Sequence, residues 1–339
     1  MEGEKRNHGL KLDEMMPKVS VIVPVYGVEK YIERCVRSLM GQTLKDMQFI
    51  FVDDCTPDNS INLLKDIIKD YPNRENQVVI LYHDNNKGLP AARQTGIQAA
   101  SGDYIAHCDS DDWVEANLYE TMYNAAITQH ADISVCNCFD SNGKVNIKER
   151  VGGYKDVITD CIDDMLHGKM WWSLCNKLIK KEIYGCAIEY PKDGMGEDMC
   201  TVLQLMLYCK NIVYCPTVHY FYYINEESIM HYLTEEKCLS NFHQINRNVE
   251  IVINVYERNN VYDYFKNGLC FIAFKSKGHL HPLLGNKVYY KLWKSSYKGV
   301  DFNVVLNKKV SIKERLLALL SMIGLFPIPR GKYSYMLKK

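Results

Sequence analysis

Three short acidic clusters stand out in the sequence, and the run from Asp109 to Asp112 indicates its chemistry most directly. Alternate residues of an extended segment point the same way, so the carboxylates of Asp109 and Asp111 can face one site. Hard divalent cations are commonly held by one or two carboxylates while substrate phosphates complete the coordination shell. The pair therefore predicts a Mg²⁺ or Mn²⁺ site. A D-x-D pattern also arises by chance, and Asp112 is suitably placed to cap a helix beginning near Trp113.

A second acidic cluster, Asp53-Asp54, ends an apolar run, and a basic segment at 87–93 opens an expected helix. Buried carboxylates are costly without partners, and a nucleotide base or ribose would supply them. The amides of a helix N-terminus attract phosphate, and Arg93 adds a charged fork one turn further in. The alternatives are a turn with a helix cap for the aspartates and an ordinary surface helix for the basic segment.

The third cluster, Glu197-Asp198, follows a glycine-flanked turn at 194–196 and precedes an apolar helix at 199–208. A catalytic base that deprotonates an incoming hydroxyl must reach it by a hydrogen bond. A carboxylate on a mobile turn before a helix can do this. The alternative is a pair of acids that only stabilises the helix N-terminus.

The elements that must position these clusters alternate between strand and helix. We expect strands at 19–26, 47–52, 78–82 and 104–108, and helices at 31–40, 61–68 and 89–100. This rhythm is typical of a doubly wound, mainly parallel sheet flanked by helices. Ligands of such sheets bind beyond the carboxyl ends of the strands. The first two acidic clusters and Tyr26 should therefore meet in one polar crevice.

The later part of the chain has a looser pattern. We expect a strand at 131–138, with Cys136 and Cys138 packed in the core, and a glycine-rich loop at 140–153. Residues 234–299 are expected to be helical. The pattern divides the chain into a flexible segment at 1–17, a sheet domain at 18–230 and a helical C-terminal region at 231–339.

Composition excludes several classes of protein. The 339 residues contain 41 Lys plus Arg and 41 Asp plus Glu, so the basic excess expected of a nucleic-acid partner is absent. The polar N-terminus lacks a signal peptide's apolar core, and the thirteen scattered cysteines are typical of reduced thiols. No apolar stretch reaches the roughly 20 residues needed to span a bilayer. We therefore expect a cytoplasmic protein.

The carboxyl end nevertheless has a membrane-like composition. Residues 308–339 contain eight Lys or Arg and one acid, Glu314, around an apolar run at 316–326. A basic, apolar helix of this kind can lie peripherally in the interface of an anionic membrane. The alternative is a helix docked on the protein's own surface.

Taken in order, these motifs resemble the bacterial family 2 glycosyltransferases, which have the GT-A fold. The resemblance covers about residues 18 to 230. The matching segments are VSVIVPVY at 19–26, QT at 42–43, VDDCTPDNS at 52–60, NKGLPAAR at 86–93, GDYIAHCDSDDW at 102–113, NKL at 176–178 and GED at 196–198. It implies an inverting enzyme that moves a sugar from a nucleotide-diphosphate sugar, a UDP-sugar by preference, to a saccharide or lipid-linked saccharide acceptor in cell-surface polysaccharide synthesis.

The resemblance also implies residue roles, which we carry over position by position. Pro24, Val25, Tyr26, Asp53 and Asp54 would form the base pocket, with Arg93, Asp109 and Ser110 also on the nucleotide sugar. Asp109 and Asp111 would hold the metal, with Asp111 the more direct ligand. Asp198 would be the catalytic base and Glu197 its neighbour.

Some positions depart from the family's pattern. Gly27 stands where relatives often carry asparagine, and Cys175 where they often carry tryptophan. The segment 222–229 resembles a late motif that usually includes arginine, but Tyr223 and Asn225 occupy the basic positions. Two other functions share parts of the pattern, namely a non-catalytic nucleotide-sugar binder and a sugar nucleotidyltransferase. The nucleotidyltransferase should have a glycine-rich, arginine-containing loop after the first strand, and Tyr26-Gly27-Val28 does not match it.

Overall fold

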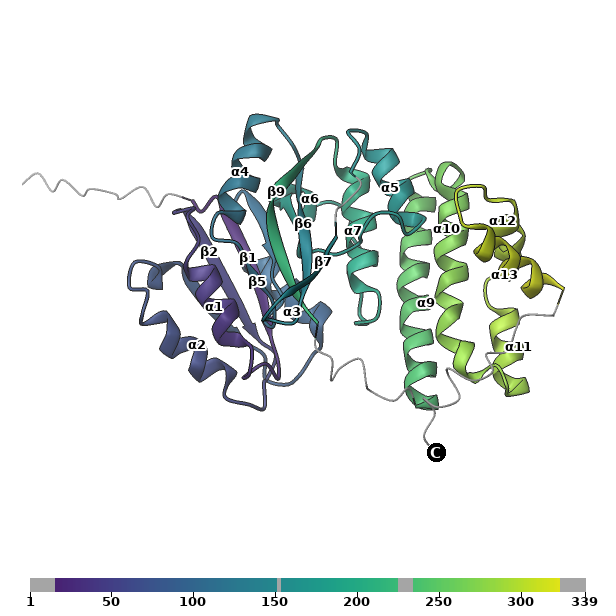
Figure 1. Ribbon diagram of the computed structural model, residues 1–339, viewed down its shortest axis with the longest axis horizontal. Helices are drawn as coiled ribbons and strands as arrows, with labels where there is room; N and C mark the ends of the chain where they lie inside the picture. Colours follow the sequence, from purple (N-terminus) through teal and green to yellow (C-terminus); the bar gives the residue numbers. More distant parts are fainter. Residues whose placement is uncertain (1–15, 151–153, 225–233, 324–339) are drawn as a thin grey trace, which may run out of the picture.

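One mixed sheet organises the molecule. The computed structural model describes residues 16–150, 154–224 and 234–323, and within them the sheet has nine strands in the order β3-β2-β1-β4-β8-β6-β9-β5, with β7 paired to β6 (Figure 1). The first half is parallel and consists of β1 (Val19–Val25), β2 (Met47–Asp53), β3 (Val78–Tyr82) and β4 (Tyr104–His107). All seven residues of β1 are buried, as its β-branched composition predicts for a central parallel strand. The expected sheet is confirmed.

The second half of the sheet changes direction. β8 (Lys177–Lys180) runs antiparallel to both β4 and β6 (Ile133–Ser141), while β9 (Ile212–Tyr223) runs parallel to β6. The short β5 (Trp113–Val114) pairs with the end of β9. As a result, the ends of β5 and β9 lie at the same edge as the acidic residues after β4.

One expected loop is wrong. The segment 140–153 was expected to be a glycine-rich loop, but β6 extends to Ser141 and β7 (Asn146–Arg150) returns beside it as a hairpin. The turn between them contains Asn142, whose side chain accepts hydrogen bonds from the amides of Lys144 and Val145, and Gly143 with φ +85°. Asparagine followed by glycine is a strong hairpin signal, which the polar composition of the segment obscured.

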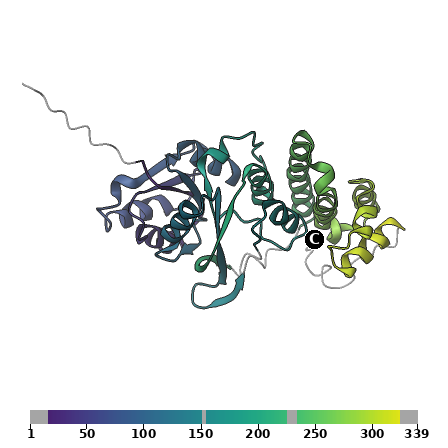
Figure 2. The same cartoon turned by 90° about the horizontal axis from the view of Figure 1, so that it is seen from above.

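Helices cover both faces of the sheet and bury two hydrophobic cores (Figures 1 and 2). One face is covered by α1 (Ile32–Met40), α2 (Ser60–Ile68) and α4 (Leu118–Thr128). The other is covered by α3 (Leu89–Ala99), α5 (Ile158–Leu166), α6 (Lys181–Tyr184) and α7 (Glu197–Tyr208). A short 3-10 turn, η1 (Glu75–Gln77), precedes β3. Cys136 and Cys138 are both buried in the first core, as expected.

The carboxyl-terminal part is helical, as the sequence predicts. It consists of α9 (Glu235–Arg258), α10 (Tyr262–Ser276), the 3-10 segment η2 (Lys277–Leu283), α11 (Lys287–Ser295), α12 (Val300–Leu306) and α13 (Ile312–Met322). The first two helices share the core of the second sheet face, since Val249, Tyr256 and Leu269 pack with residues of α5 and α7. Among the described helices, none is both long and apolar enough to cross a bilayer.

Candidate active site

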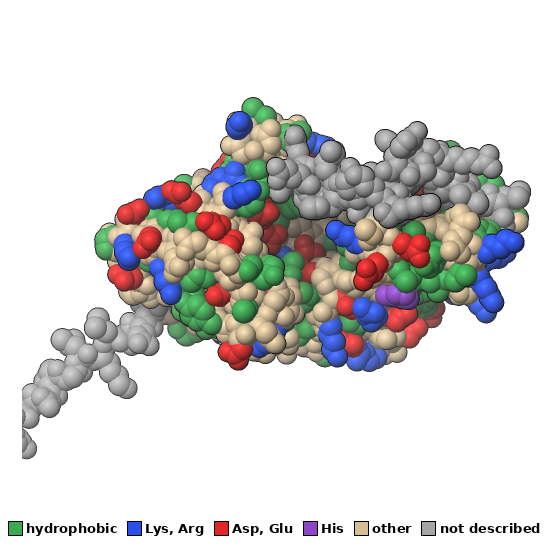
Figure 3. Space-filling model, turned by 90° about the horizontal axis from the view of Figure 1, so that it is seen from below, with side chains coloured by type: hydrophobic (Ala, Val, Ile, Leu, Met, Phe, Trp, Pro, Cys, Tyr) green, Lys and Arg blue, Asp and Glu red, His purple; other side chains and the backbone are tan. Residues whose placement is uncertain are grey.

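A cavity of about 490 Å³ opens where β1, β2 and β4 end and α3 begins. Seen from this side, the molecular surface is hollowed near its middle, and acidic side chains gather in the hollow (Figure 3). Seven predicted site residues line this cavity, namely Pro24, Val25, Tyr26, Asp54, Asp109, Ser110 and Asp111. Val28, Asn86, Gly88, Leu89 and Ala92 complete its lining. The convergence of strand ends inferred from the sequence is therefore present.

The loop after β1 is held by a chain of hydrogen bonds. Gly27 adopts φ +68°, and its amide donates to Oγ1 of Thr56 at 2.8 Å. The Thr56 hydroxyl donates to Asp58, and the Thr56 amide donates to Oδ1 of Asp53 at 2.8 Å. Asp53 therefore shapes the turn that supports this loop, while Tyr26 remains half exposed at the cavity mouth. A flat aromatic ring in that position can stack on a planar base.

Asp54 is buried, and its carboxylate organises the opposite wall. Oδ1 lies 2.7 Å from Nδ1 of His83 and accepts the Lys87 amide at 2.8 Å, while Oδ2 accepts the Gly88 amide at 2.8 Å. His83 also lies 2.9 Å from Oγ1 of Thr95. Each carboxylate oxygen accepts about two hydrogen bonds, so Oδ2 keeps one position for a donor in the cavity. No motif in the sequence singles out His83.

Asp109 and Asp111 present a concentrated negative charge to this cavity. Burial raises the pKa of Asp109, against the opposing effect of Arg93, and burial together with Asp109 raises the pKa of Asp111 to about 6. Both shifts have the same cause, namely carboxylates held together in a poorly solvated place. A cation bound between them would favour their charged forms.

Arg93, which we expect near the nucleotide, has a buried guanidinium. It does not itself line the cavity, but it contacts Asp109, which does. Nε of Arg93 donates to Glu197 at 2.9 Å, and Nη2 lies 3.0 Å from Asp109 and 3.5 Å from Asp198. Burial alone would lower the pKa of Arg93, but the surrounding carboxylates raise it well above its usual value. Arg93 therefore joins the first acidic cluster, through Asp109, to the third, through Glu197 and Asp198.

The role expected for Asp112 is wrong. It was expected to cap a helix near Trp113, but that residue begins β5, and the next helix starts at Leu118. Asp112 is fully buried instead, where its carboxylate accepts the Tyr220 hydroxyl and the Tyr223 amide, both at 2.6 Å. It ties the acidic segment 109–112 to the end of β9. A partner more than a hundred residues away leaves no local pattern in the sequence.

Glu197 and Asp198 begin α7, but the turn before them is anchored rather than free. Gly196 has φ +77°, and a Cβ there would lie 2.2 Å from Cδ1 of Ile245 in α9. The side chain of Asn248, also in α9, donates to the carbonyls of Asp193 and Met195 at 3.0 and 2.8 Å. The expected mobile turn is therefore clamped by the C-terminal region. Burial raises the pKa of Glu197, although Arg93 opposes the shift.

A second cavity of about 240 Å³ is lined by Asp198 and by several aromatic side chains. The guanidinium of Arg150, from the end of β7, lies 3.6 Å from the ring centre of Trp171 and 5.6 Å from that of Tyr222. Its Nε also pairs with Asp140 at 2.6 Å. Trp172 and Ser173 complete the lining. Sequence reasoning missed Arg150 because the hairpin that carries it was not predicted.

Buried Lys177 holds the loop that carries these aromatic residues. Its ammonium donates to the carbonyls of Trp171 and Ser173 at 3.1 and 2.6 Å, and to the side chain of Asn176 at 2.8 Å. Burial lowers the pKa of Lys177 to about 8. The motif at 176–178 pointed to this position, but its role depends on the three-dimensional path of the loop.

Arg34 and Tyr223 shape the same edge. Arg34 of α1 donates to the carbonyl of Asp111 at 2.8 Å, and its guanidinium lies over the rings of Trp113 and Tyr223 at 3.7 and 4.7 Å. Tyr223 therefore packs against a basic residue at a position where the family usually has one. Asn225, the other departing position, lies outside the described residues.

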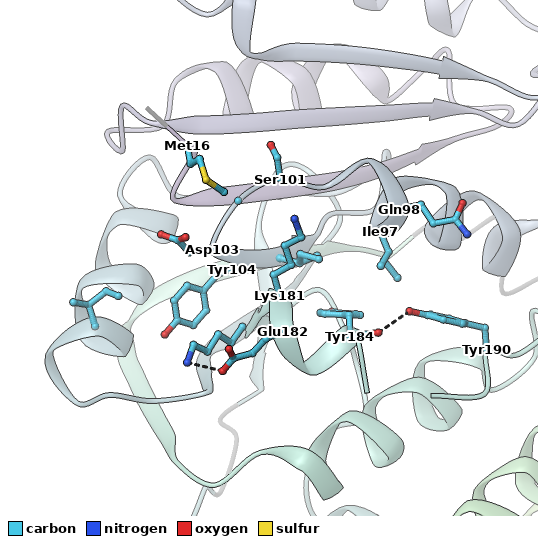
Figure 4. A pocket seen from close by; sticks show the side chains of 15 residues that line it. Met16, Ile97, Gln98, Ser101, Asp103, Tyr104, Lys181, Glu182, Tyr184 and Tyr190 are labelled. Carbon is cyan, nitrogen blue, oxygen red and sulfur yellow. Dashed lines mark hydrogen bonds and ion pairs between the residues drawn. The ribbon is translucent and has the colours of Figure 1, made fainter. Parts of the chain in front are cut away.

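A larger cavity of about 700 Å³ lies at the opposite, amino-terminal ends of β1 and β4. Met16, Ile97, Tyr104 and Tyr184 contribute to its mostly apolar lining, and its charged groups include the Lys180–Glu182 pair at 2.6 Å (Figure 4). None of the three acidic clusters lines it. The candidate chemistry therefore belongs to the smaller pair of cavities.

The donor set fits a divalent cation that also binds substrate. In the described part of the chain, no group of three or more His, Cys, Asp or Glu side chains is arranged to hold a metal by itself. Asp109 and Asp111 offer a pair of carboxylates on an open cavity, which matches sites where phosphate oxygens supply the other ligands.

Comparison with known proteins gives related sequences and folds. A family model for glycosyl transferase family 2 matches residues 20–187. EpsH of Bacillus subtilis, named as a glycosyltransferase, is 32% identical over 222 residues, which are 63% of each chain. EpsJ of the same organism, named as an uncharacterized glycosyltransferase, is 42% identical over 125 residues, 37% of this chain and 35% of EpsJ. The chain thus spans less than two thirds of these two relatives.

Among solved structures, S. aureus TarS 1-349 in complex with UDP-GlcNAc has a TM-score of 0.66 at 17% identity. The match covers 91% of this chain and 88% of that chain. At this level of identity the similarity establishes the fold, and that fold is the GT-A arrangement expected from the sequence.

Proposed function

We propose that the chain is a family 2 glycosyltransferase that moves a sugar from a UDP-sugar to a hydroxyl of a saccharide acceptor, with inversion at the anomeric carbon. One observation carries the proposal. A single nitrogen, Nη2 of Arg93, lies 3.0 Å from Asp109, which lines the larger of the two adjacent cavities, and 3.5 Å from Asp198, which lines the smaller. The two cavities therefore meet at one cluster of charge.

The cavity of about 490 Å³, which we call the donor cavity, suits the nucleotide end of the donor. Tyr26 is exposed beside the free acceptor position of Asp54, so a base with an N–H group can stack on the ring and donate to Oδ2. Uracil has such an N–H group. A protein of the same fold, TarS, has been solved with UDP-GlcNAc, which supports a UDP-sugar as the donor.

The diphosphate would lie over Asp109, Ser110 and Asp111, with the two aspartates holding Mg²⁺ or Mn²⁺. When bound, the cation supplies positive charge that stabilises the leaving diphosphate. The carboxylates provide the negative charge that binds this cation, and Ser110 lines the cavity between them. Among the described residues, Arg93 alone forms ion pairs with Asp109, Glu197 and Asp198. Asp111 adds a further negative charge to the cavity, so without a cation the site would repel a diphosphate.

Asp198 would act as the base. Its side chain is one third exposed and faces the smaller cavity, where an acceptor hydroxyl can reach it. In a single displacement, the hydroxyl oxygen bonds to the anomeric carbon, its proton passes to Asp198, and the bond to the diphosphate oxygen breaks. Glu197 and Arg93 orient Asp198 from behind. The clamped turn fixes the base, which favours reaction between correctly placed groups.

The cavity of about 240 Å³, which we call the acceptor cavity, suits a sugar ring of the acceptor. Trp171, Trp172 and Tyr222 provide flat apolar faces, while Arg150 and Ser173 provide hydrogen-bond donors at the edge. Among the described residues, the charged side chains that line it are Arg150, which is already paired with Asp140, and Asp198, so no free cation is left for a phosphate and a neutral saccharide fits better than a phosphorylated one. A lipid-linked saccharide used in cell-surface polysaccharide synthesis could present such a terminal sugar at this cavity.

The test uses a panel of nucleotide sugars with and without Mn²⁺. Thermal shifts should identify a UDP-sugar as the preferred donor, with a shift that depends on the metal, and release of UDP should require Asp198. We expect Asp198→Asn to lower transfer about 10²- to 10⁴-fold, the usual contribution of a general base. Metal-dependent donor binding without any turnover by the wild type, across a panel of saccharide acceptors, would instead indicate a non-catalytic nucleotide-sugar binder.

A further inference from the structure

Helix α13 turns its most apolar side away from the protein. Ile312, Leu316, Leu319 and Ile323 follow one another at intervals of three or four residues, so they form one stripe along the helix. Their exposed fractions are 73%, 53%, 40% and 58%. A surface helix of a globular protein normally buries such a stripe and exposes its polar side. The reversed orientation indicates that another apolar phase meets this helix.

The opposite side of α13 packs against the protein, and these contacts prevent the helix from rotating about its axis. Ala318 and Ser321 are buried on the inner side. Glu314 pairs with Lys275 of α10 at 3.1 Å, and Nε of Arg315 donates to the carbonyl of Val305 at 2.8 Å. These contacts fix which side of the helix faces outward.

The neighbouring helix adds further apolar surface. α12 packs against α13 and exposes Phe302 and Leu306, at 54% and 59%. Both helices lie at the end of the molecule opposite the parallel half of the sheet (Figures 1 and 2). We call the exposed side chains of Phe302, Leu306 and the stripe on α13 the apical face. Contact through the apical face would leave the donor cavity uncovered.

Charge selects the partner of the apical face. Lys308 and Lys313 are exposed near the start of the stripe, and among the described residues 308–323 Glu314 is the one acid. That acid, Glu314, is already paired with Lys275. A second copy of the chain docked symmetrically would bring the same basic residues toward each other, which is unfavourable.

We propose that the apical face docks on the surface of an anionic lipid bilayer, with its apolar side chains among the acyl chains and its lysines among the headgroups. Helices with this distribution lie in the plane of the interface, and both apolar area and attraction to anionic lipid contribute to binding. α13 is eleven residues long, so it lies on the membrane rather than across it. Membrane docking concerns a surface separate from the donor and acceptor cavities.

The test is co-sedimentation of the full chain with vesicles of phosphatidylcholine alone or mixed with phosphatidylglycerol. The wild type should bind the anionic vesicles and lose binding at high salt. Leu316→Ser should weaken binding about tenfold or more, because the lost apolar area cannot enter the bilayer. Lys313→Ala should weaken it about fivefold, the usual effect of one cation near an anionic surface.

The matched control is Ile127→Ser in α4, which removes a side chain of similar exposure, 48%, far from the apical face. It should bind vesicles like the wild type, and both serine variants should keep the nucleotide-induced thermal shift, which shows that they are folded. Failure of the wild type to bind anionic vesicles would overturn the proposal. So would self-association that Leu316→Ser abolishes, or vesicle binding that appears only when residues 324–339 are removed.

Discussion

The two adjacent cavities of the site are built in different ways. The donor cavity is formed by the ends of three parallel strands and the start of α3, and backbone amides supply many of its hydrogen bonds. The acceptor cavity is formed by a hairpin end, an irregular loop and the first turn of α7. Single buried polar side chains hold these pieces together, namely Lys177, Asn248, Asp112 and Arg93. Regular strands therefore fix one cavity, and long-range side-chain contacts fix the other.

This difference suggests that the acceptor side should be more sensitive to single substitutions than the donor side. A strand end is held by many equivalent hydrogen bonds, and losing one side chain leaves the others in place. A buried Lys or Asn that donates to two or three carbonyls has no such substitute, because each abandoned carbonyl would remain buried without a partner. The predictions below test this difference.

The largest expected effect is on the residue that joins the two cavities. Arg93→Met should lower the free energy of unfolding by about 3–5 kcal/mol, because it leaves Asp109, Glu197 and Asp198 close together without their counter-charge. Arg37→Met is the matched control. Arg37 also pairs with two carboxylates, Glu33 and Asp70, but it is 43% exposed, so the change should be near zero. Equal losses in chemical denaturation would contradict the central role of Arg93.

The next effect is a pH dependence. The pKa of Lys177 is about 8 in the folded protein and returns to 10.5 on unfolding, so between these values the unfolded state binds more protons. The contribution of Lys177 to the free energy of unfolding should therefore rise with pH through this window, by up to about 3 kcal/mol. The measurement is the difference in the free energy of unfolding between the wild type and Lys177→Met at each pH. Buried cysteines and tyrosines titrate in both proteins, so their contributions cancel in this difference. A difference that is flat from pH 8 to 10.5 would show that Lys177 is not desolvated.

A smaller effect is expected at the turn before the base. Gly196→Ala places a Cβ 2.2 Å from Ile245 in a left-handed conformation, whereas Gly168→Ala meets nothing within 4 Å at φ +69°. The left-handed conformation alone should lower the free energy of unfolding of each variant by roughly 1–2 kcal/mol. Only Gly196→Ala should also reduce kcat, because Ile245 must move and Asp198 moves with the turn. An unchanged kcat in that variant would separate the turn from the position of the base.

The smallest effect is on acceptor binding. Trp171→Ala should raise the acceptor KM about fivefold, through loss of an aromatic contact of roughly 1 kcal/mol, and should leave the donor Kd unchanged. Trp171→Phe should restore part of the loss, since it keeps a flat ring. A change in donor affinity of the same size would mean that the two cavities do not bind separate substrates.

The donor cavity follows from the sequence because its rules are local. A β-branched run such as 19–25 predicts a buried strand, and alternation of strand and helix predicts where the strand ends meet. The sequence pattern alone therefore predicts that Asp54, Asp109 and Asp111 lie at the same edge of the sheet. What the pattern could not supply was His83, which contacts Asp54 from another strand end.

The acceptor cavity could not be predicted, and the reason is physical. Asp112 followed by an aromatic residue has the same local signature whether it caps a helix or accepts a hydrogen bond from Tyr220, 108 residues away. The glycines at 194 and 196 indicate a flexible turn until Asn248 and Ile245 of α9 are placed against it. Contacts of this kind depend on how distant segments pack, which no periodicity in the sequence encodes.

The most direct test of the account is a matched pair of substitutions, Asp111→Asn and Asp198→Asn, studied by calorimetric titration of the UDP-sugar with Mn²⁺ and by transfer to an acceptor. Each replaces one carboxylate of the site by an amide with almost no change in volume, Asp111 in one cavity and Asp198 in the other. The account predicts that Asp111→Asn loses metal-dependent donor binding, whereas Asp198→Asn binds donor like the wild type and transfers no sugar. Equal donor affinities in the two variants, or transfer by Asp198→Asn at the wild-type rate, would contradict the division of the site into a donor cavity and a base.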